Sequence, residues 1–168
     1  MKKLLTLCIS LLAAINLEAQ SIIGSWVTIQ EQNGQNIAIL FGFEADNSAI
    51  MKTIYEINDE DLGVLNLELT VEGTYTLSGK KLTLKLDKNT LETSLGDVEW
   101  SDNAKQVIKK DPKQENFLRK TIEDHFAAEK SSYAEDLEEN EEMTVISLTK
   151  TELVLKSEDD TMTFKKFN

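Results

Sequence analysis

Short segments in which apolar and polar residues alternate fill most of the chain, and they constrain its fold more than any other feature. The clearest segment is 64–72, where every second residue from Leu65 to Val71 is apolar. This period of two places the apolar side chains on one face of a β-strand. The sequence predicts strands at 23–31, 36–44, 49–57, 64–72, 74–77, 81–87, 143–148, 153–155 and 161–166, with a weaker one at 91–95.

Short turns separate most of these segments. Asn33-Gly34 lies between the first two strands and is the strongest short-range signal for a β-hairpin. Such links favour antiparallel pairing of strands that follow one another, whereas a Greek-key sandwich usually requires longer crossovers. The predicted fold class is therefore mostly β, an antiparallel up-and-down β-barrel of about 8–10 strands with one inserted α-helix.

The segment 97–142 has a different character. Asp111, Pro112 and Gln114 are typical of a helix start, and we expect a helix from about 112 to 130 that breaks near Ser131. We expect this helix to pack on the outer wall of the barrel. The alternative is that the helix forms a lid over the barrel mouth. Its apolar stripe comprises Leu118, Ile122, Phe126, Tyr133 and Leu137, with Phe117 beside it.

The first nineteen residues have the features of a secretion signal. Lys2 and Lys3 precede an apolar stretch at 4–15, and Ala19 ends a plausible signal peptidase site. We therefore expect an exported protein, periplasmic or extracellular, in which residues 20–168 form a single domain with an insertion at 97–142. The apolar stretch continues past Cys8, so lipid anchoring is not expected, and no stable membrane span remains after signal removal.

Composition argues against several classes of function. The formal net charge is −12, and removal of Lys2, Lys3 and Glu18 (net +1) leaves −13, which disfavours binding of nucleic acid or of an anionic membrane. Cys8 is the only cysteine and His125 the only histidine, so we expect no metal site. The acidic groups 59–61 and 158–160 lack the spacing of a calcium loop. No catalytic motif is present, and we expect neither enzymatic activity nor a cofactor.

One motif on the first predicted strand points to a family. Gly24-Ser25-Trp26 resembles the Gly-x-Trp element of lipocalins and of small secreted bacterial lipocalin-like proteins. The segments 41–43, 72–82 and 150–153 resemble the same proteins. The resemblance spans 21–96 and 143–168, and it implies that Trp26 lies inside the barrel near its closed end, with Gly24 allowing close backbone approach.

The chain also departs from that family. It lacks the Thr-Asp-Tyr element, and it lacks the late arginine that packs across the tryptophan, since its single arginine is Arg119 on the predicted helix. Lys165 and Lys166 are the residues that can cover the Trp26 ring instead, by a cation–π contact.

The barrel interior is the candidate ligand site. An eight-stranded barrel is either just filled by its side chains or holds one small ligand. We predict a secreted lipocalin-like protein that binds a small apolar or amphipathic ligand in the barrel. The alternative is a non-enzymatic protein-interaction module with a filled barrel, acting through its surface and the 97–142 insertion. The candidate lining residues are Trp26, Ile39, Phe41, Phe43, Leu67, Leu69 and Tyr75.

Overall fold

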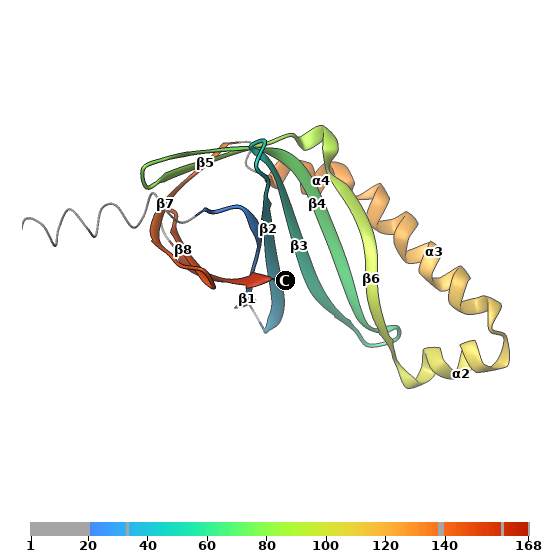
Figure 1. Cartoon of the computed structure of the whole chain (residues 1–168). Coiled ribbons are helices and arrows are strands. Elements are labelled where there is room, and N and C mark those ends of the chain that lie inside the picture. Colours follow the sequence, from blue (N-terminus) through green and yellow to red (C-terminus); the bar gives the residue numbers. More distant parts are fainter. Residues whose placement is uncertain (1–20, 33, 138–139, 159, 168) are drawn as a thin grey trace, which may run out of the picture.

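The described chain is an antiparallel β-meander with a helical segment before its last three strands (Figure 1). A computed structural model describes residues 21–32, 34–137, 140–158 and 160–167; the predicted signal segment 1–19 lies outside them. The strands are β1 (Gly24–Gln32), β2 (Gln35–Phe43), β3 (Ser48–Asp59), β4 (Gly63–Ser78), β5 (Lys81–Leu86), β6 (Glu92–Trp100), β7 (Asn140–Leu148), β8 (Glu152–Lys156) and β9 (Thr161–Phe167). The helices are η1 (Lys88–Thr90), α2 (Asp102–Lys110), α3 (Lys113–Ala128) and α4 (Lys130–Asp136).

Strand pairing closes a barrel. Among the described residues, eight strands pair in the cyclic order β1-β2-β3-β4-β5-β7-β8-β9, and the pairing of β9 with β1 completes the ring. All of these pairs are antiparallel. Figure 1 shows this ring end-on at its left. The predicted mostly-β, up-and-down barrel is confirmed, and closure leaves fewer strand edges unpaired.

Three strands continue from the ring as a flared sheet, which consists of residues 53–59 of β3, residues 63–70 of β4 and β6. Residues 53–55 of β3 still pair with β2 of the ring. Over 63–70, β4 pairs with β3 on one side and β6 on the other, whereas from Gly73 to Ser78 it pairs with β5. The short 3-10 helix η1 carries the chain from β5 to β6 at the point where the flared sheet leaves the barrel. In Figure 1 this sheet runs away from the ring toward α2.

Gly73 lies where the barrel and the flared sheet meet. The sequence predicts a strand break there, and this prediction is wrong, because β4 continues through Gly73. A Cβ atom at this position would lie 2.2 Å from the backbone oxygen of Lys85. The glycine therefore allows β5 to approach closely while Ala49 of β3 pairs on the other side.

One continuous face of β3 and β4 serves both the barrel and the flared sheet. We call it the inner face, and it carries the odd-numbered residues 49–57 and 65–75, since side chains alternate along a strand. At the barrel end, Ala49 and Tyr75 belong to the barrel core. At the flared end, Leu65 and Leu67 belong to a second core together with Ile122 of α3.

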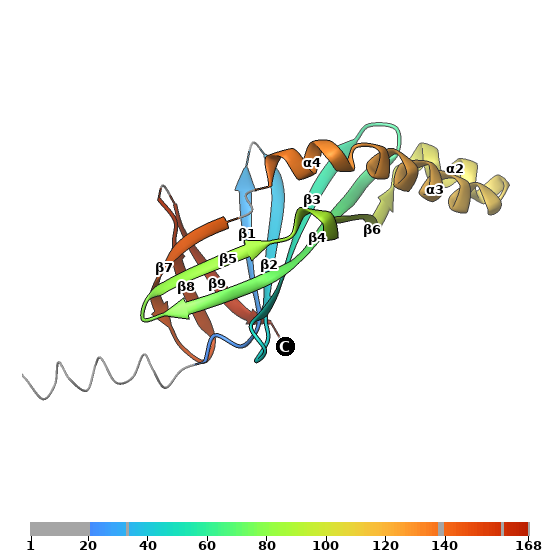
Figure 2. The ribbon, with the colours of Figure 1, turned by 90° about the horizontal axis from the view of Figure 1, so that it is seen from above.

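The helical segment covers the inner face of the flared sheet. Ile122 and Phe126 are buried against it, with Leu118 and Tyr133 partly buried beside them. The prediction that the helix packs on the outer wall is therefore wrong. A flared sheet without this cover would expose an apolar face, and burial of such surface stabilises the fold. Figures 1 and 2 show α4 next to the barrel and α2 farthest from it.

The helix boundaries differ from the predicted ones. The start is close to the prediction, and the Asp111 carboxylate accepts a hydrogen bond from the backbone N–H of Lys113 at 3.1 Å. The break falls at Glu129 rather than near Ser131, and α2 was not predicted. Within the residues described, no helix is long and apolar enough to cross a membrane.

Candidate functional site

Trp26 of β1 and Lys166 of β9 lie in contact where the first and last strands of the barrel pair. The Trp26 side chain is buried, and its indole N–H donates a hydrogen bond to the backbone oxygen of Ile22 at 2.7 Å. The Lys166 ammonium lies 4.3 Å from the centroid of the Trp26 ring and donates to the backbone oxygen of Ile23 at 2.6 Å. Lys166 thus makes the contact expected of the missing arginine.

Gly24 leaves room for that lysine. Its φ is +117°, a conformation that other L-residues rarely adopt, and an added Cβ would lie 2.2 Å from the Lys166 Nζ. The close approach at Gly24 therefore involves the side chain of Lys166. Any side chain at position 24 would displace the ammonium from its place over the Trp26 ring.

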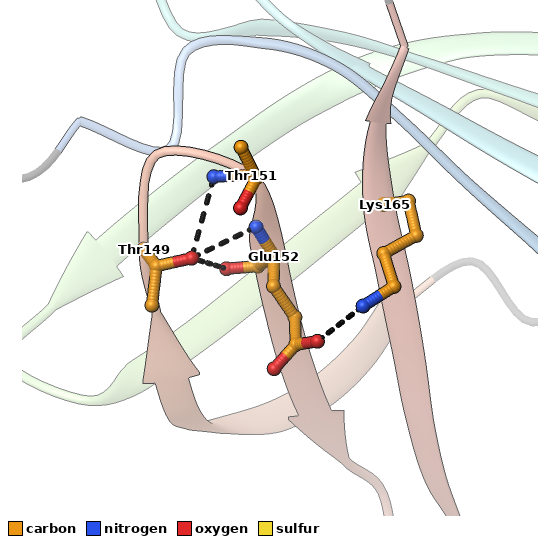
Figure 3. A network of polar contacts seen from close by, with 4 residues as sticks. All are labelled: Thr149, Thr151, Glu152 and Lys165. Atoms are coloured by element: carbon orange, nitrogen blue, oxygen red, sulfur yellow. Dashed lines mark hydrogen bonds and ion pairs between the residues drawn. The ribbon is translucent and has the colours of Figure 1, made fainter.

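The turn between β7 and β8 is joined to β9 by polar contacts (Figure 3). The Thr149 hydroxyl accepts hydrogen bonds from the backbone N–H groups of Thr151, at 3.3 Å, and Glu152, at 2.9 Å. The backbone oxygen of Thr151 accepts from the N–H of Lys166 at 3.0 Å, and Glu152 forms an ion pair with Lys165. These contacts hold the Lys166 backbone in the register that places its side chain over Trp26.

Aromatic side chains pack ring against ring in the barrel interior. The Phe41 ring centroid lies 5.8 Å from that of Phe43 and 5.2 Å from that of Phe164, and Phe43 lies 4.9 Å from Tyr75. The Tyr75 hydroxyl donates to the backbone oxygen of Glu44 at 2.9 Å. Burial, together with the nearby Asp46 and Glu44 charges, raises the pKa of Tyr75. These four rings belong to the barrel core.

The predicted lining residues separate into three places. Trp26, Ile39, Phe41, Phe43 and Tyr75 lie in or against the barrel core. Leu67 lies under the helical segment, and Leu69 lies between the two regions. The barrel and the flared sheet share one inner face. Residues that alternate in the same way along a strand therefore belong either to the barrel core or to the core under the helical segment.

Leu69 borders a cavity where the flared sheet leaves the barrel. This inner cavity has a volume of about 130 Å³. The inner face of β3 and β4 forms one wall, Leu91 after η1 forms an edge, and α4 and the residue that follows it form the cover. Its lining residues are Met51, Thr53, Tyr55, Leu69, Val71, Leu91, Tyr133 and Leu137.

The lining of the inner cavity is apolar with a few hydroxyl groups. Thr53 is 9% exposed and is the one buried polar residue among those that the structure describes. The Tyr133 hydroxyl donates to the Glu129 carboxylate at 3.2 Å. Burial, reinforced by this hydrogen bond and the Glu129 charge, raises the pKa of Tyr133, so its phenol stays neutral well above neutral pH. The cavity is suited to an uncharged molecule with a large apolar surface.

Sequence reasoning identified Leu69 but missed the rest of the cavity as a unit. Thr53 carried a usable signal, because it is the polar position in the apolar series from Ala49 to Ile57. Tyr133 and Leu137 were assigned to the helical stripe, but nothing in the stripe shows which sheet face it covers.

The other titratable groups considered in the sequence have ordinary surface roles. His125 is exposed on α3, with its Nε2 3.7 Å from the Glu129 carboxylate. Asp59 accepts hydrogen bonds from the backbone N–H groups of Asp61 and Leu62, and so stabilises the turn between β3 and β4. In the described part of the chain, no three His, Cys, Asp or Glu side chains gather as a metal site.

Larger depressions lie on the outer surface. One has a volume of about 590 Å³, and the residues lining it include the ion-paired Lys81 and Glu142 and the exposed Ile146 and Lys156. It is open to solvent and bordered by charged side chains. The inner cavity is smaller, but it lies between two layers of the fold and has an apolar lining.

Comparison with known proteins gives structural matches of low sequence identity. No protein-family model matches the chain, and no curated protein matches it. A crystal structure of a lipocalin-like protein from Bacteroides uniformis is 16% identical, with 87% of this chain and 98% of that chain covered at a TM-score of 0.43. A structure of an uncharacterized protein from Bacteroides eggerthii is 17% identical, with 88% and 100% covered at a TM-score of 0.41. The strand pairing itself shows the closed, up-and-down antiparallel barrel.

Proposed function

We propose that this chain is an exported, non-enzymatic binding protein that holds one small apolar or amphipathic molecule in the inner cavity. The observation that carries the proposal is the apolar space between the inner face and α4, lined by Met51, Leu69, Val71, Leu91 and Leu137. Concave sites with a mostly apolar lining and a few polar groups are the usual form of small-molecule sites. The predicted secretion signal favours a role outside the cytoplasm.

The size of the cavity limits the ligand. A dry, apolar protein cavity of about 150 Å³ can bind benzene. The inner cavity, at about 130 Å³, therefore suits a molecule with roughly one six-membered ring or a short branched chain. Sites for drug-sized ligands are larger, about 300–1,000 Å³. The proposal is thus for a small ligand rather than for a long-chain lipid.

The cover supplied by α4 determines access. Tyr133 and Leu137 approach the cavity from the helical segment, whereas Met51, Leu69 and Val71 approach from the sheet. A ligand between these layers is removed from water on both sides, which is the condition under which apolar contact contributes most to binding.

A cavity-filling substitution tests the proposal. Leu69→Phe adds a ring beside the cavity, and Leu137→Trp fills it from the helical side. The matched control is Ile50→Phe, because Ile50 is 44% exposed on the opposite face of β3. We expect toluene to bind the wild type and Ile50→Phe with similar affinity in calorimetric titrations, and to bind both filled variants at least about tenfold more weakly. Equal affinity for all four proteins would contradict this site.

A second candidate, a protein-interaction module, has its own observation. Val107 of α2 and Phe117 of α3 are 48% and 64% exposed on the helical segment. Phenylalanine is enriched at interaction surfaces relative to the rest of a protein surface. Cross-linking of the wild type and of a Val107→Ser, Phe117→Ser double variant in envelope extract distinguishes the candidates. A cross-linked species lost only in the double variant would support the interaction module.

A further inference from the structure

Thr53 occupies a position where a polar side chain requires explanation. It lies in the middle of β3, with Ile39 of β2 and Leu69 of β4 as its partners across the two strand pairs. Met51 and Tyr55 flank it on the same inner face. A valine would have nearly the same shape here and would suit this environment better, because buried hydroxyl groups normally require a hydrogen-bond partner.

The Thr53 hydroxyl has no hydrogen-bond partner within the residues described, and only 9% of the residue is exposed. The backbone of Thr53 lies in the interior of a sheet and is paired with a strand on each side. The hydroxyl therefore has no turn or helix end beside it whose free backbone groups could serve as partners. Thr53 is one of the residues that line the inner cavity. The cavity is therefore the place where a partner for its hydroxyl would lie.

The chemistry of the other lining residues sets the charge of that partner. None of the eight lining side chains is ionised at neutral pH, and the nearby carboxylate of Glu129 already accepts from Tyr133. A carboxylate ligand would meet no cation among the lining residues and would be repelled by Glu129. An ammonium ligand would lose its bound water on entering the cavity, and no carboxylate among the lining residues would compensate for that loss.

We propose that the molecule bound in the inner cavity is a neutral amphiphile whose single hydroxyl or carbonyl group pairs with the hydroxyl of Thr53. A threonine hydroxyl donates and accepts, so it serves either group. The apolar part of the ligand contacts Met51, Leu69, Val71 and Leu91. This inference rests on the proposed function and adds the chemical class of the ligand and the residue that selects it.

Phenol, toluene and benzoate test the inference, because they share one ring and differ in a hydroxyl, a methyl and a carboxylate group. The proteins are the wild type, Thr53→Val, which removes the hydroxyl at nearly constant shape, and Thr53→Ser, which retains it. Affinity is measured by calorimetric titration of the full chain. A double-mutant comparison isolates the pair of hydroxyl groups from the general effect of ring burial.

We expect the preference for phenol over toluene to fall by about fivefold or more in Thr53→Val and to be retained in Thr53→Ser. We also expect benzoate to bind at least about tenfold more weakly than phenol to all three proteins. If toluene and phenol bind but their ratio is the same in Thr53→Val, the hydroxyl is satisfied without the ligand and the inference is overturned while the binding function stands. If neither neutral probe binds the wild type, the proposed function is overturned together with the inference.

Discussion

Lys166 stabilises the junction between β9 and β1 through two contacts of one ammonium group. Its Nζ lies over the Trp26 ring at 4.3 Å and donates to the backbone oxygen of Ile23 at 2.6 Å. The ring holds β1 through its own hydrogen bond to Ile22. The ammonium therefore connects the last strand, the first strand and the segment before it.

Lys166→Met is expected to lower the free energy of unfolding by about 1–2 kcal/mol, the combined effect of a cation–π contact and a charged hydrogen bond. The matched control is Lys165→Met, because Lys165 is the exposed neighbour whose ion pair with Glu152 lies on the surface. Lys165→Met is expected to lower the free energy of unfolding by less than about 1 kcal/mol. Urea unfolding followed by circular dichroism measures both, and equal losses would contradict the role given to Lys166.

Asp46 provides a prediction about pH at the turn between β2 and β3. Its Oδ1 accepts from the Ser48 hydroxyl at 2.6 Å and from the Ser48 backbone N–H at 3.0 Å, and these hydrogen bonds lower the pKa of Asp46 from its usual 3.8. The resulting contribution to stability is present above pH 3.8 and is lost as pH falls through the lower folded pKa. In Ser48→Ala we expect the pKa to rise toward 3.8 in a carbon-detected NMR titration, and an unchanged pKa would contradict this cause.

At the scale of elements, Gly73 joins the barrel to the flared sheet. Gly73→Ala places a Cβ 2.2 Å from the backbone oxygen of Lys85, and the free energy of unfolding is expected to fall by about 2 kcal/mol or more, as in overpacked cores. Gly42→Ala is the control, since its nearest neighbour would be the Ile50 Cβ at an ordinary 3.9 Å. Thermal unfolding compares the two variants, and a Gly73→Ala protein as stable as Gly42→Ala would contradict the close approach.

Helix α3 is attached to the flared sheet through a few buried side chains. Phe126 is buried in this interface, whereas Phe117 on the same helix is 64% exposed. Phe126→Ala is expected to destabilise the fold by about 3–5 kcal/mol. Phe117→Ala is expected to change the free energy of unfolding by less than about 0.5 kcal/mol. Urea unfolding of the pair provides the measurement, and a reversed order would place the helix on another face.

The elements show what sequence could and could not predict. Period-two alternation located most strands because each has one buried face, as 64–72 of β4 illustrates. The same alternation did not distinguish barrel interior from flared sheet, since Leu67 and Tyr75 share a face and differ only in what covers it. Gly73 suggested a break because its role depends on Lys85, a residue of another strand. The helix α2 was missed because it buries only Ala104.

At the scale of the whole molecule, the closed barrel has a packed core, whereas a cavity lies at its junction with the covered flared sheet. The barrel is stabilised by Trp26 and Lys166 where β1 pairs with β9 and by packed phenylalanine rings in its core. The inner cavity lies where the barrel opens onto the flared sheet, and there the lining comes from two layers, the sheet and the helical segment. Binding at that junction would couple the position of α4 to the ligand.

The most direct test of the account is a methyl NMR titration of the wild-type chain with phenol. We predict saturable shifts at the methyl groups of Met51, Leu69, Val71 and Leu91 around the inner cavity. The methyl groups of Leu82 and Leu84, fully buried in the barrel core, are expected to remain unchanged. Saturable shifts at Leu82 and Leu84, or no saturable shift at the cavity residues, would contradict the claim that the ligand site lies between the inner face and α4.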